Sequence, residues 1–303
     1  MSTPPGRDRV APPAAARSRG SIGSWRREHR LQKSAVCQRR QGAIASPRPP
    51  PPDREDRSGA GGVKSAFASL AVALSLSPGW SQDGVYPDPS RFEAAIAAFE
   101  AADSLSPPPE GAVVAVGSSS MRGWHRRIDA DLAPLTVVPR GFGGSTMRDV
   151  LHFAKRIVTK HRPRAVLLYE GDNDVAVGVE PACIRATFDS LAAVVQRIWP
   201  RPRLYVISVK PSPRRWHLWP RMQATNELLR AACDEAGWMT FIDVAGPMLD
   251  EHGLPRPEIF LADSLHMNDA GYDIWADVVG PLLREREAVF EQVSSWSGGD
   301  QDG

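Results

Sequence analysis

The sequence predicts a three-layer α/β/α domain built around a five-stranded parallel β-sheet. Five short runs of mostly apolar, often β-branched residues alternate with helix-length segments in which apolar residues recur every three or four positions. The short runs have no polar face, which is typical of strands that helices cover on both sides. Strands that alternate with helices in this way pair in parallel. The predicted strands are residues 112–116, 136–138, 165–169, 204–208 and 240–242.

The spacing of apolar residues also predicts the helices between these strands. A first helix starts near residue 91, with Phe92, Ile96 and Phe99 on one face, and the prolines at 107–109 end it. We place one domain at residues 85–290 and expect residues 291–303 to be a disordered tail. The remaining helices are predicted from three further sets of apolar residues, namely Met147, Val150, Leu151, Ala154, Ile157 and Val158; Ile184, Phe188, Leu191, Val195 and Ile198; and, from about Ala270, Ile274, Trp275, Val278, Val279 and Leu282.

Residues 1–62 differ in composition from the rest of the chain. They are rich in Arg, Pro, Ser and Gly and show little apolar periodicity. Such a segment buries too little apolar surface to offset the entropy of ordering, so we predict a disordered basic tail. The rest of the chain holds more acidic than basic residues and no basic stripe. No nucleic-acid partner is therefore predicted.

Residues 63–81 have the layout of a secretory signal peptide. Lys64 precedes a short run of Ala, Leu and Ser that ends before Pro78 and Gly79. The run is too short and too weakly hydrophobic for a stable membrane span. Because signal peptides begin a chain, we interpret residues 1–62 as a mis-assigned start and expect translation from Val63, giving a secreted or periplasmic protein. The alternative, an Ala-rich helix after a disordered tail, predicts a cytoplasmic protein.

The residues that follow each strand are the candidates for chemistry, because ligands bind at the carboxyl ends of parallel strands. Ser119 follows the first strand directly, at the start of a helix that favours nearby negative charge. Three glycines follow or end the second strand, and their backbone can point N–H groups at an anion. Asn173, after the third strand, can add a side-chain N–H donor.

An aspartate and a histidine three residues apart follow the fifth strand. At this spacing the Asp263 carboxylate can hold the His266 ring and fix its tautomer. Each of these signals is weak alone, since Gly-Ser loops and Asp–His contacts are common. Together they provide a nucleophile, anion-binding donors, a base and its orienting carboxylate, which are the components of acyl transfer.

These motifs resemble the conserved blocks of the SGNH, or GDSL-like, hydrolases, in family order and over about residues 85–290. Residues 117–119 are similar to the Gly-Asp-Ser block, residues 171–174 to the Gly-x-Asn-Asp block and residues 263–266 to the Asp-x-x-His block. The Gly-Ser-Ser-Ser sequence, with residues 169–174 and 210–213, resembles a bacterial subgroup of lipases or acylhydrolases. The resemblance implies a flavodoxin-like sheet and a metal-free esterase that needs no cofactor.

The resemblance also assigns roles to individual residues. Ser119 is the nucleophile, His266 the general base and Asp263 the carboxylate that stabilises the imidazolium. Ser118 replaces the Asp of the family, which leaves Ser118 and Ser120 as rival nucleophiles, but Ser119 alone aligns with the catalytic serine. The expected oxyanion hole consists of the backbone N–H groups of Ser119 and Gly144 and the side-chain amide of Asn173.

The substrate is predicted only as a class. Short-chain esters are expected because no long apolar lid segment is present, while acetylated sugars and lysophospholipids stay open. Trp124, Trp216 and Trp219 could stack on a sugar or line an acyl pocket, or could simply pack. The oligomeric state is not indicated.

Three alternatives remain at this stage. Residues 141–146 partly match a dinucleotide-binding loop, with Glu170 as the ribose ligand, which would indicate an oxidoreductase, although Thr146 replaces the third glycine. The triad could instead be a scaffold in a catalytically silent carbohydrate- or lipid-binding module. Metal-dependent hydrolysis through Asp263, His266 and Asp269 lacks a second histidine at ligand spacing.

Overall fold

The computed structural model describes residues 86–198 and 203–294. The predicted basic tail at 1–62 and the predicted signal peptide at 63–81 lie outside the described residues. Within the two described ranges, no helix is both long enough and apolar enough to cross a membrane.

Five parallel strands form one sheet in the order β2-β1-β3-β4-β5. This is the flavodoxin-like order, so the predicted fold class is confirmed. Each predicted strand overlaps an observed one, but β2 continues past residue 138 through Pro139 and Arg140. Proline is tolerated there because β2 lies at the edge of the sheet. The strands are β1 Val113–Gly117, β2 Val137–Gly141, β3 Ala165–Tyr169, β4 Arg203–Ile207 and β5 Met239–Ile242.

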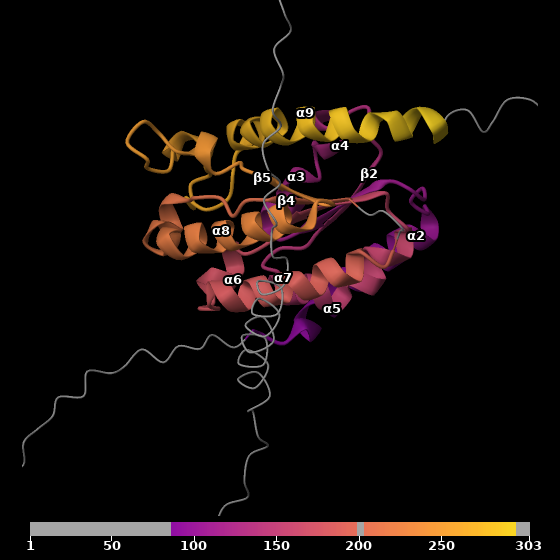
Figure 1. Ribbon diagram of the computed structural model, residues 1–303, viewed down its shortest axis with the longest axis horizontal. Helices are drawn as coiled ribbons and strands as arrows, with labels where there is room; N and C mark the ends of the chain where they lie inside the picture. Colours follow the sequence, from indigo (N-terminus) through magenta and orange to yellow (C-terminus); the bar gives the residue numbers. More distant parts are fainter. Residues whose placement is uncertain (1–85, 199–202, 295–303) are drawn as a thin grey trace, which may run out of the picture.

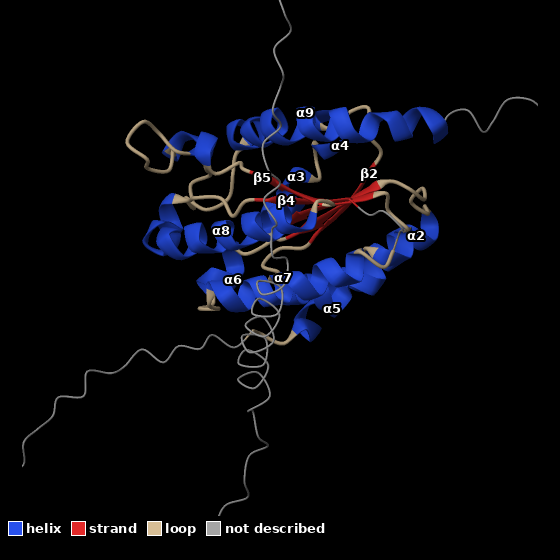
Figure 2. Ribbon diagram, viewed as in Figure 1, coloured by secondary structure: helices blue, strands red, loops and turns tan. Residues whose placement is uncertain are grey.

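Helices cover both faces of the sheet, which gives the three predicted layers (Figures 1 and 2). One face is covered by α2 Glu93–Leu105, α5 Met147–Ile157, α7 Pro181–Val195 and α8 Trp219–Ala236, and the other by α3 Ser119–Trp124, α4 Ile128–Asp131 and α9 Asp269–Ser294. The short helix α6, Asp172–Ala176, follows β3. Helices α3, α4 and α6 are too short to display the apolar period from which α2, α5, α7 and α9 are predicted. The long helix α8 is not among the predicted helices.

Side chains of each strand alternate between two hydrophobic cores, one on each face. In β1, Val114 and Val116 pack in the core beneath α5 and α7, whereas Val113 and Ala115 pack in the core beneath α9. Burial of both faces explains why the strands have no polar face in the sequence.

The final helix extends further than predicted. It reaches Ser294, so the boundary placed at residue 290 falls inside α9. Tertiary contacts of Glu291 explain the extension. The Glu291 carboxylate accepts hydrogen bonds from the Thr136 N–H at 2.7 Å and from the Thr136 hydroxyl at 2.8 Å, and the same carboxylate pairs with Arg164.

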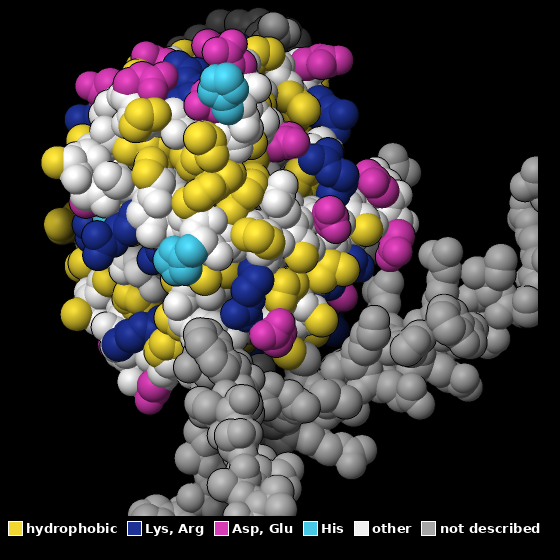
Figure 3. Space-filling model, turned by 90° about the vertical axis from the view of Figure 1, so that its left-hand side faces the viewer, with side chains coloured by type: hydrophobic (Ala, Val, Ile, Leu, Met, Phe, Trp, Pro, Cys, Tyr) yellow, Lys and Arg dark blue, Asp and Glu magenta, His cyan; other side chains and the backbone are white. Residues whose placement is uncertain are grey.

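The loops at the carboxyl ends of the strands gather on the left of Figure 1. They are joined there by the long segment between β5 and α9, which contains Asp263 and His266. Figure 3 looks onto this side of the molecule and shows hydrophobic side chains gathered over its upper half. The exposed large hydrophobic residues of that segment are Leu254 and Leu261.

Candidate active site

Three consecutive serines follow β1, and they differ in exposure. Ser118 and Ser120 retain only 1% and 2% of their accessible area, whereas Ser119 is half-buried. Ser119 is the first residue of α3, where a backbone N–H has no intrahelical acceptor. Gly117 precedes the serines because a Cβ there would lie 2.2 Å from the Tyr169 carbonyl oxygen. Of the three hydroxyls, that of Ser119 is therefore the one open to a substrate.

Asp263 and His266 form the predicted pair. His266 Nδ1 lies 2.6 Å from Asp263 Oδ2, and the backbone N–H groups of Leu265 and His266 both donate to Asp263 Oδ1 at 2.9 Å. These hydrogen bonds, the one from the histidine ring first, hold the pKa of Asp263 well below its usual range. The carboxylate therefore stays ionised and fixes the ring so that its other nitrogen is free to accept a proton.

The triad is not closed by a direct contact in the structure. Within residues 86–198 and 203–294, no hydrogen bond joins the Ser119 hydroxyl to the His266 ring. Active-site hydrogen bonds commonly tighten only when substrate binds.

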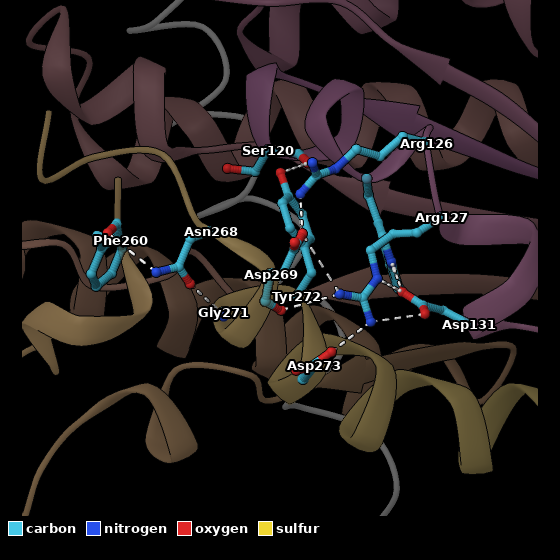
Figure 4. Close-up of polar contacts among 11 residues, drawn as sticks. Ser120, Arg126, Arg127, Asp131, Phe260, Asn268, Asp269, Gly271, Tyr272 and Asp273 are labelled. Atoms are coloured by element: carbon cyan, nitrogen blue, oxygen red, sulfur yellow. Dashed lines mark hydrogen bonds and ion pairs between the residues drawn. The ribbon is translucent and has the colours of Figure 1, made fainter. Parts of the chain in front are cut away.

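Contacts next to these residues join the two loops. The Tyr272 hydroxyl in the first turn of α9 donates to the Ser120 carbonyl at 2.9 Å. Arg126 pairs with Asp269, and Arg127 pairs with Asp273 at 2.6 Å, so two further bonds link the end of α3 to the start of α9 (Figure 4). These bonds fix the loop that contains His266 beside the helix that begins at Ser119.

The start of α9 has its own cap. Asn268 Oδ1 accepts the Gly271 N–H at 3.2 Å (Figure 4). The Asn268 amide donates to the Glu258 carbonyl at 2.7 Å. A side-chain acceptor at this position satisfies a free N–H of the first turn. It thereby sets where the His266 loop ends and the helix begins.

The predicted oxyanion groups lie in adjoining loops. Gly144 has a φ of +86° and is exposed, so a side chain there would be strained. Asn173 Nδ2 donates to the Ser145 carbonyl at 2.9 Å, and Asn173 Oδ1 accepts from Arg215 Nη1 at 3.0 Å. Because an amide nitrogen has two hydrogens, one remains for a ligand.

Two cations, Lys210 and Arg215, for which the sequence predicts no role, hold this region together. Arg215 Nη1 also bonds Asp172 Oδ1 at 2.7 Å, and so orients the Asn173 side chain. Lys210 is buried, donates to the Leu265 carbonyl at 2.8 Å and lies 3.7 Å from Asp172 Oδ2. Burial lowers the pKa of Lys210, and the charge of Asp172 opposes that shift. A lysine directly after an apolar strand was the one signal that could have revealed this link.

Two buried carboxyls support the glycine loop from below. Glu170 Oε1 accepts a hydrogen bond from the Ser145 hydroxyl at 2.5 Å. Both Asp174 carboxylate oxygens accept from the backbone N–H of Met147, each at 3.1 Å from its nitrogen. Burial raises the pKa of Glu170 well above its usual range, and it raises the pKa of Asp174 to about 7. Glu170 is thus committed to Ser145 within the protein. Its assignment as a ribose ligand is wrong, because a carboxylate with 1% exposure has no surface to offer a nucleotide.

The pKa of Asp174 predicts a pH-dependent stability. Its ordinary value is 3.8 and its folded value about 7, so between them the folded state binds more protons than the unfolded state, and stability falls as pH rises. Asp174→Asn can still accept the Met147 N–H but does not titrate. We expect the free energy of unfolding of the wild type, relative to this variant, to decrease between about pH 4 and about pH 7 in urea titrations. If the free energies of unfolding of the wild type and of Asp174→Asn changed with pH in parallel, the raised pKa of Asp174 would be contradicted. Asp129→Asn, which replaces an exposed aspartate, is the matched control.

The predicted substrate contact of Trp124 is wrong. Its side chain has no accessible area, donates to Asp131 Oδ2 at 2.6 Å and packs against Tyr272 and Trp275. A fully buried ring has no face for a sugar or an acyl chain. The physical reason is that α3 turns this residue under α9, towards the sheet.

Trp216 and Trp219 stack on each other with ring centroids 5.7 Å apart. Trp219 is buried at 7% exposure, whereas Trp216 is half-buried and follows Arg215, which bonds Asn173. Of the three predicted tryptophans, Trp216 alone retains a substantial surface next to the site.

The candidate metal ligands do not form a cluster. The Asp269 carboxylate pairs with Arg126, and Asp263 is bonded to His266. In the part of the chain that the structure describes, no three His, Cys, Asp or Glu side chains are placed to share a metal ion.

Solved structures with this fold include three bacterial proteins. A candidate platelet activating factor from Streptococcus pneumonia is 17% identical, with a TM-score of 0.57, and the match covers 64% of this chain and 93% of that chain. A candidate acylhydrolase from Bacteroides fragilis is 18% identical, with a TM-score of 0.54 and coverage of 65% of this chain and 95% of that chain. A GDSL-like lipase from Bacteroides thetaiotaomicron is 22% identical, with a TM-score of 0.53 and coverage of 65% of this chain and 98% of that chain. At such identities the similarity is one of fold. No curated protein matches the chain significantly.

The sheet order and the helices on both faces are those of the SGNH hydrolase fold. The model of the GDSL-like lipase/acylhydrolase family matches residues 106–274, more than half of the chain. The chain belongs to this family of ester hydrolases.

Proposed function

We propose that the protein hydrolyses carboxylic esters with Ser119, His266 and Asp263 as its catalytic triad. The observation on which the proposal depends is the short Asp263–His266 bond at the carboxyl end of the sheet, where Ser119 is the accessible one of three consecutive serines. Membership of the acylhydrolase family supports the same reaction. The nucleotide-binding alternative loses its ribose ligand, since Glu170 is buried.

In the first half-reaction, the Ser119 oxygen attacks the ester carbonyl while His266 accepts the hydroxyl proton. Asp263 stabilises the imidazolium through the 2.6 Å bond to Nδ1. The tetrahedral intermediate then expels the alcohol, which takes the proton from His266, and leaves an acyl-serine. Water, deprotonated by His266, attacks the acyl-serine in the second half-reaction and releases the acid.

The oxyanion of each intermediate is stabilised by three N–H donors. We propose the backbone N–H groups of Ser119 and Gly144 and the free amide hydrogen of Asn173. Arg215 keeps that amide oriented, because it occupies the Asn173 oxygen at 3.0 Å. Such donors act mainly on the transition state, where the charge develops.

Asn173→Ala is therefore expected to lower kcat by about 10²–10³-fold with a much smaller change in KM. The measurement is steady-state hydrolysis of a p-nitrophenyl ester, with circular dichroism to verify that the loss of the Ser145 contact leaves the fold intact. An unchanged kcat in a folded variant would exclude Asn173 from the oxyanion hole.

Short-chain acyl esters are the proposed substrates, with acetylated sugars and lysophospholipids as narrower possibilities. The half-buried Trp216 beside Arg215 is the aromatic side chain proposed to contact the substrate. A series of p-nitrophenyl esters from acetate to laurate tests the acyl preference. A maximum of kcat/KM at the long-chain end would contradict the short-chain proposal, and the absence of hydrolysis across the series would contradict esterase activity on simple esters.

A further inference from the structure

Arg122 is an exposed cation at the edge of the proposed site. It lies three residues after Ser119 in α3, a spacing at which two side chains share one helix face. Within the described residues its side chain makes no hydrogen bond or ion pair. The nearby Arg126 and Arg127 instead pair with aspartates of α9.

The guanidinium of Arg122 lies against the glycine loop. A Cβ built on Gly143 would be 3.2 Å from Arg122 Cζ and 3.2 Å from Nη1. A side chain at Gly143 would crowd the guanidinium in its present position. The next residue is Gly144, whose N–H is a proposed oxyanion donor, so the charge lies between the serine helix and the oxyanion loop.

The surroundings leave this charge uncompensated. The pKa of the half-buried His125 is lowered to about 4, first by burial and then by the positive charges of Arg140 and Arg122. His125 is accordingly neutral and accepts the Gly141 N–H at 2.8 Å. Arg140 is itself paired with Asp103. Of the four arginines Arg122, Arg126, Arg127 and Arg140, Arg122 is therefore the one whose charge remains available to a ligand.

We propose that Arg122 is a specificity-determining residue that selects esters with a carboxylate near the scissile bond. The proposal rests on the esterase function proposed above and narrows its substrate class to anionic esters. A guanidinium presents paired N–H donors that match the two oxygens of a carboxylate, and a charge-assisted bond of this kind is stronger than a neutral one. An ester without the carboxylate lacks this contact and binds less well at the same position.

The test uses two matched pairs of substrates that differ in charge. The first pair, 4-acetoxybenzoate and 4-acetoxybenzamide, has the charge on the alcohol side, and the second, mono-4-nitrophenyl adipate and 4-nitrophenyl hexanoate, has it on the acyl side. For the wild type we expect a higher kcat/KM for the anionic member of at least one pair, which also identifies the side. Arg122→Gln is expected to lower that anionic-to-neutral ratio by about 10-fold, and Arg122→Lys to give an intermediate value.

Two controls isolate the contact from the overall charge. Arg126→Gln removes the same charge from a guanidinium already paired with Asp269, and it is expected to change the ratio by less than about twofold. The wild-type preference should also decrease with added salt, because an exposed charge is screened. Ratios unaffected by Arg122→Gln in both pairs would overturn the proposal, as would a wild type that prefers both neutral esters. Absence of hydrolysis of all four esters by the wild type would instead contradict the esterase function.

Discussion

Replacing Ser119 with alanine is expected to lower kcat/KM for ester hydrolysis by about 10⁴-fold or more. The variant has no hydroxyl oxygen that could form the acyl intermediate. His266 alone cannot replace the serine as the nucleophile. Residual activity would come from the oxyanion donors, which act on attacking water as well. The measurement is hydrolysis of p-nitrophenyl acetate by purified wild type and variant.

Ser118→Ala and Ser120→Ala are the matched controls for this experiment. Both hydroxyls are buried, so each variant is expected to keep its activity within about tenfold of the wild type. A fluorophosphonate reagent should label the wild type once, on the peptide that contains Ser119, and should not label Ser119→Ala. Near-native activity of Ser119→Ala would refute the nucleophile assignment. A wild type that neither reacts with the reagent nor hydrolyses esters would favour the silent binding module.

The largest expected effect on stability is at the opposite end of the sheet. Glu287 in α9 is fully buried and accepts bonds from Tyr205 Oη at 2.6 Å and Arg164 Nε at 3.2 Å, with Arg203 Nε 2.6 Å away. Glu287→Ala leaves Arg164, a buried cation, with less compensation for its charge. We expect the free energy of unfolding to fall by about 3–5 kcal/mol in urea titrations.

Glu285 provides the control on the same helix. Its side chain is exposed, and Glu285→Ala is expected to change the free energy of unfolding by less than about 0.5 kcal/mol. Equal effects of the two substitutions would show that the buried network adds no stability. Because Glu287 lies away from the strand-end loops, the folded fraction of Glu287→Ala should keep its kcat/KM.

Much of the fold could be predicted from the chain because its patterns are local. The apolar run of β3 was assigned with its observed bounds, since a strand buried on both faces has no polar interruption. The edge strand β2 was predicted too short, because Pro139 and Arg140 look like a strand end. Arg140 is buried there only because Asp103 of α2 supplies its counter-charge.

The Asp263–His266 pair was predictable for a similar reason. The two residues lie in one turn, and a spacing of three residues nearly determines whether their side chains can meet. No spacing along the chain predicts the partners of Lys210 and Arg215. Their partners Leu265, Asp172 and Asn173 are about 40 or more residues away in the chain, so only folding brings them together.

The class of fold, the family and the residue types at each strand end can be predicted from the chain alone, because periodicity and short motifs depend on neighbours along the chain. The accessibility of the side chains follows only from the folded arrangement: Ser119 is open where Ser118 and Ser120 are buried, and Trp124 lies in the core. The folded arrangement also places Arg122 against Gly143, and within the described residues no carboxylate pairs with it. Exposure and charge compensation depend on segments that are distant in the chain and adjacent in space.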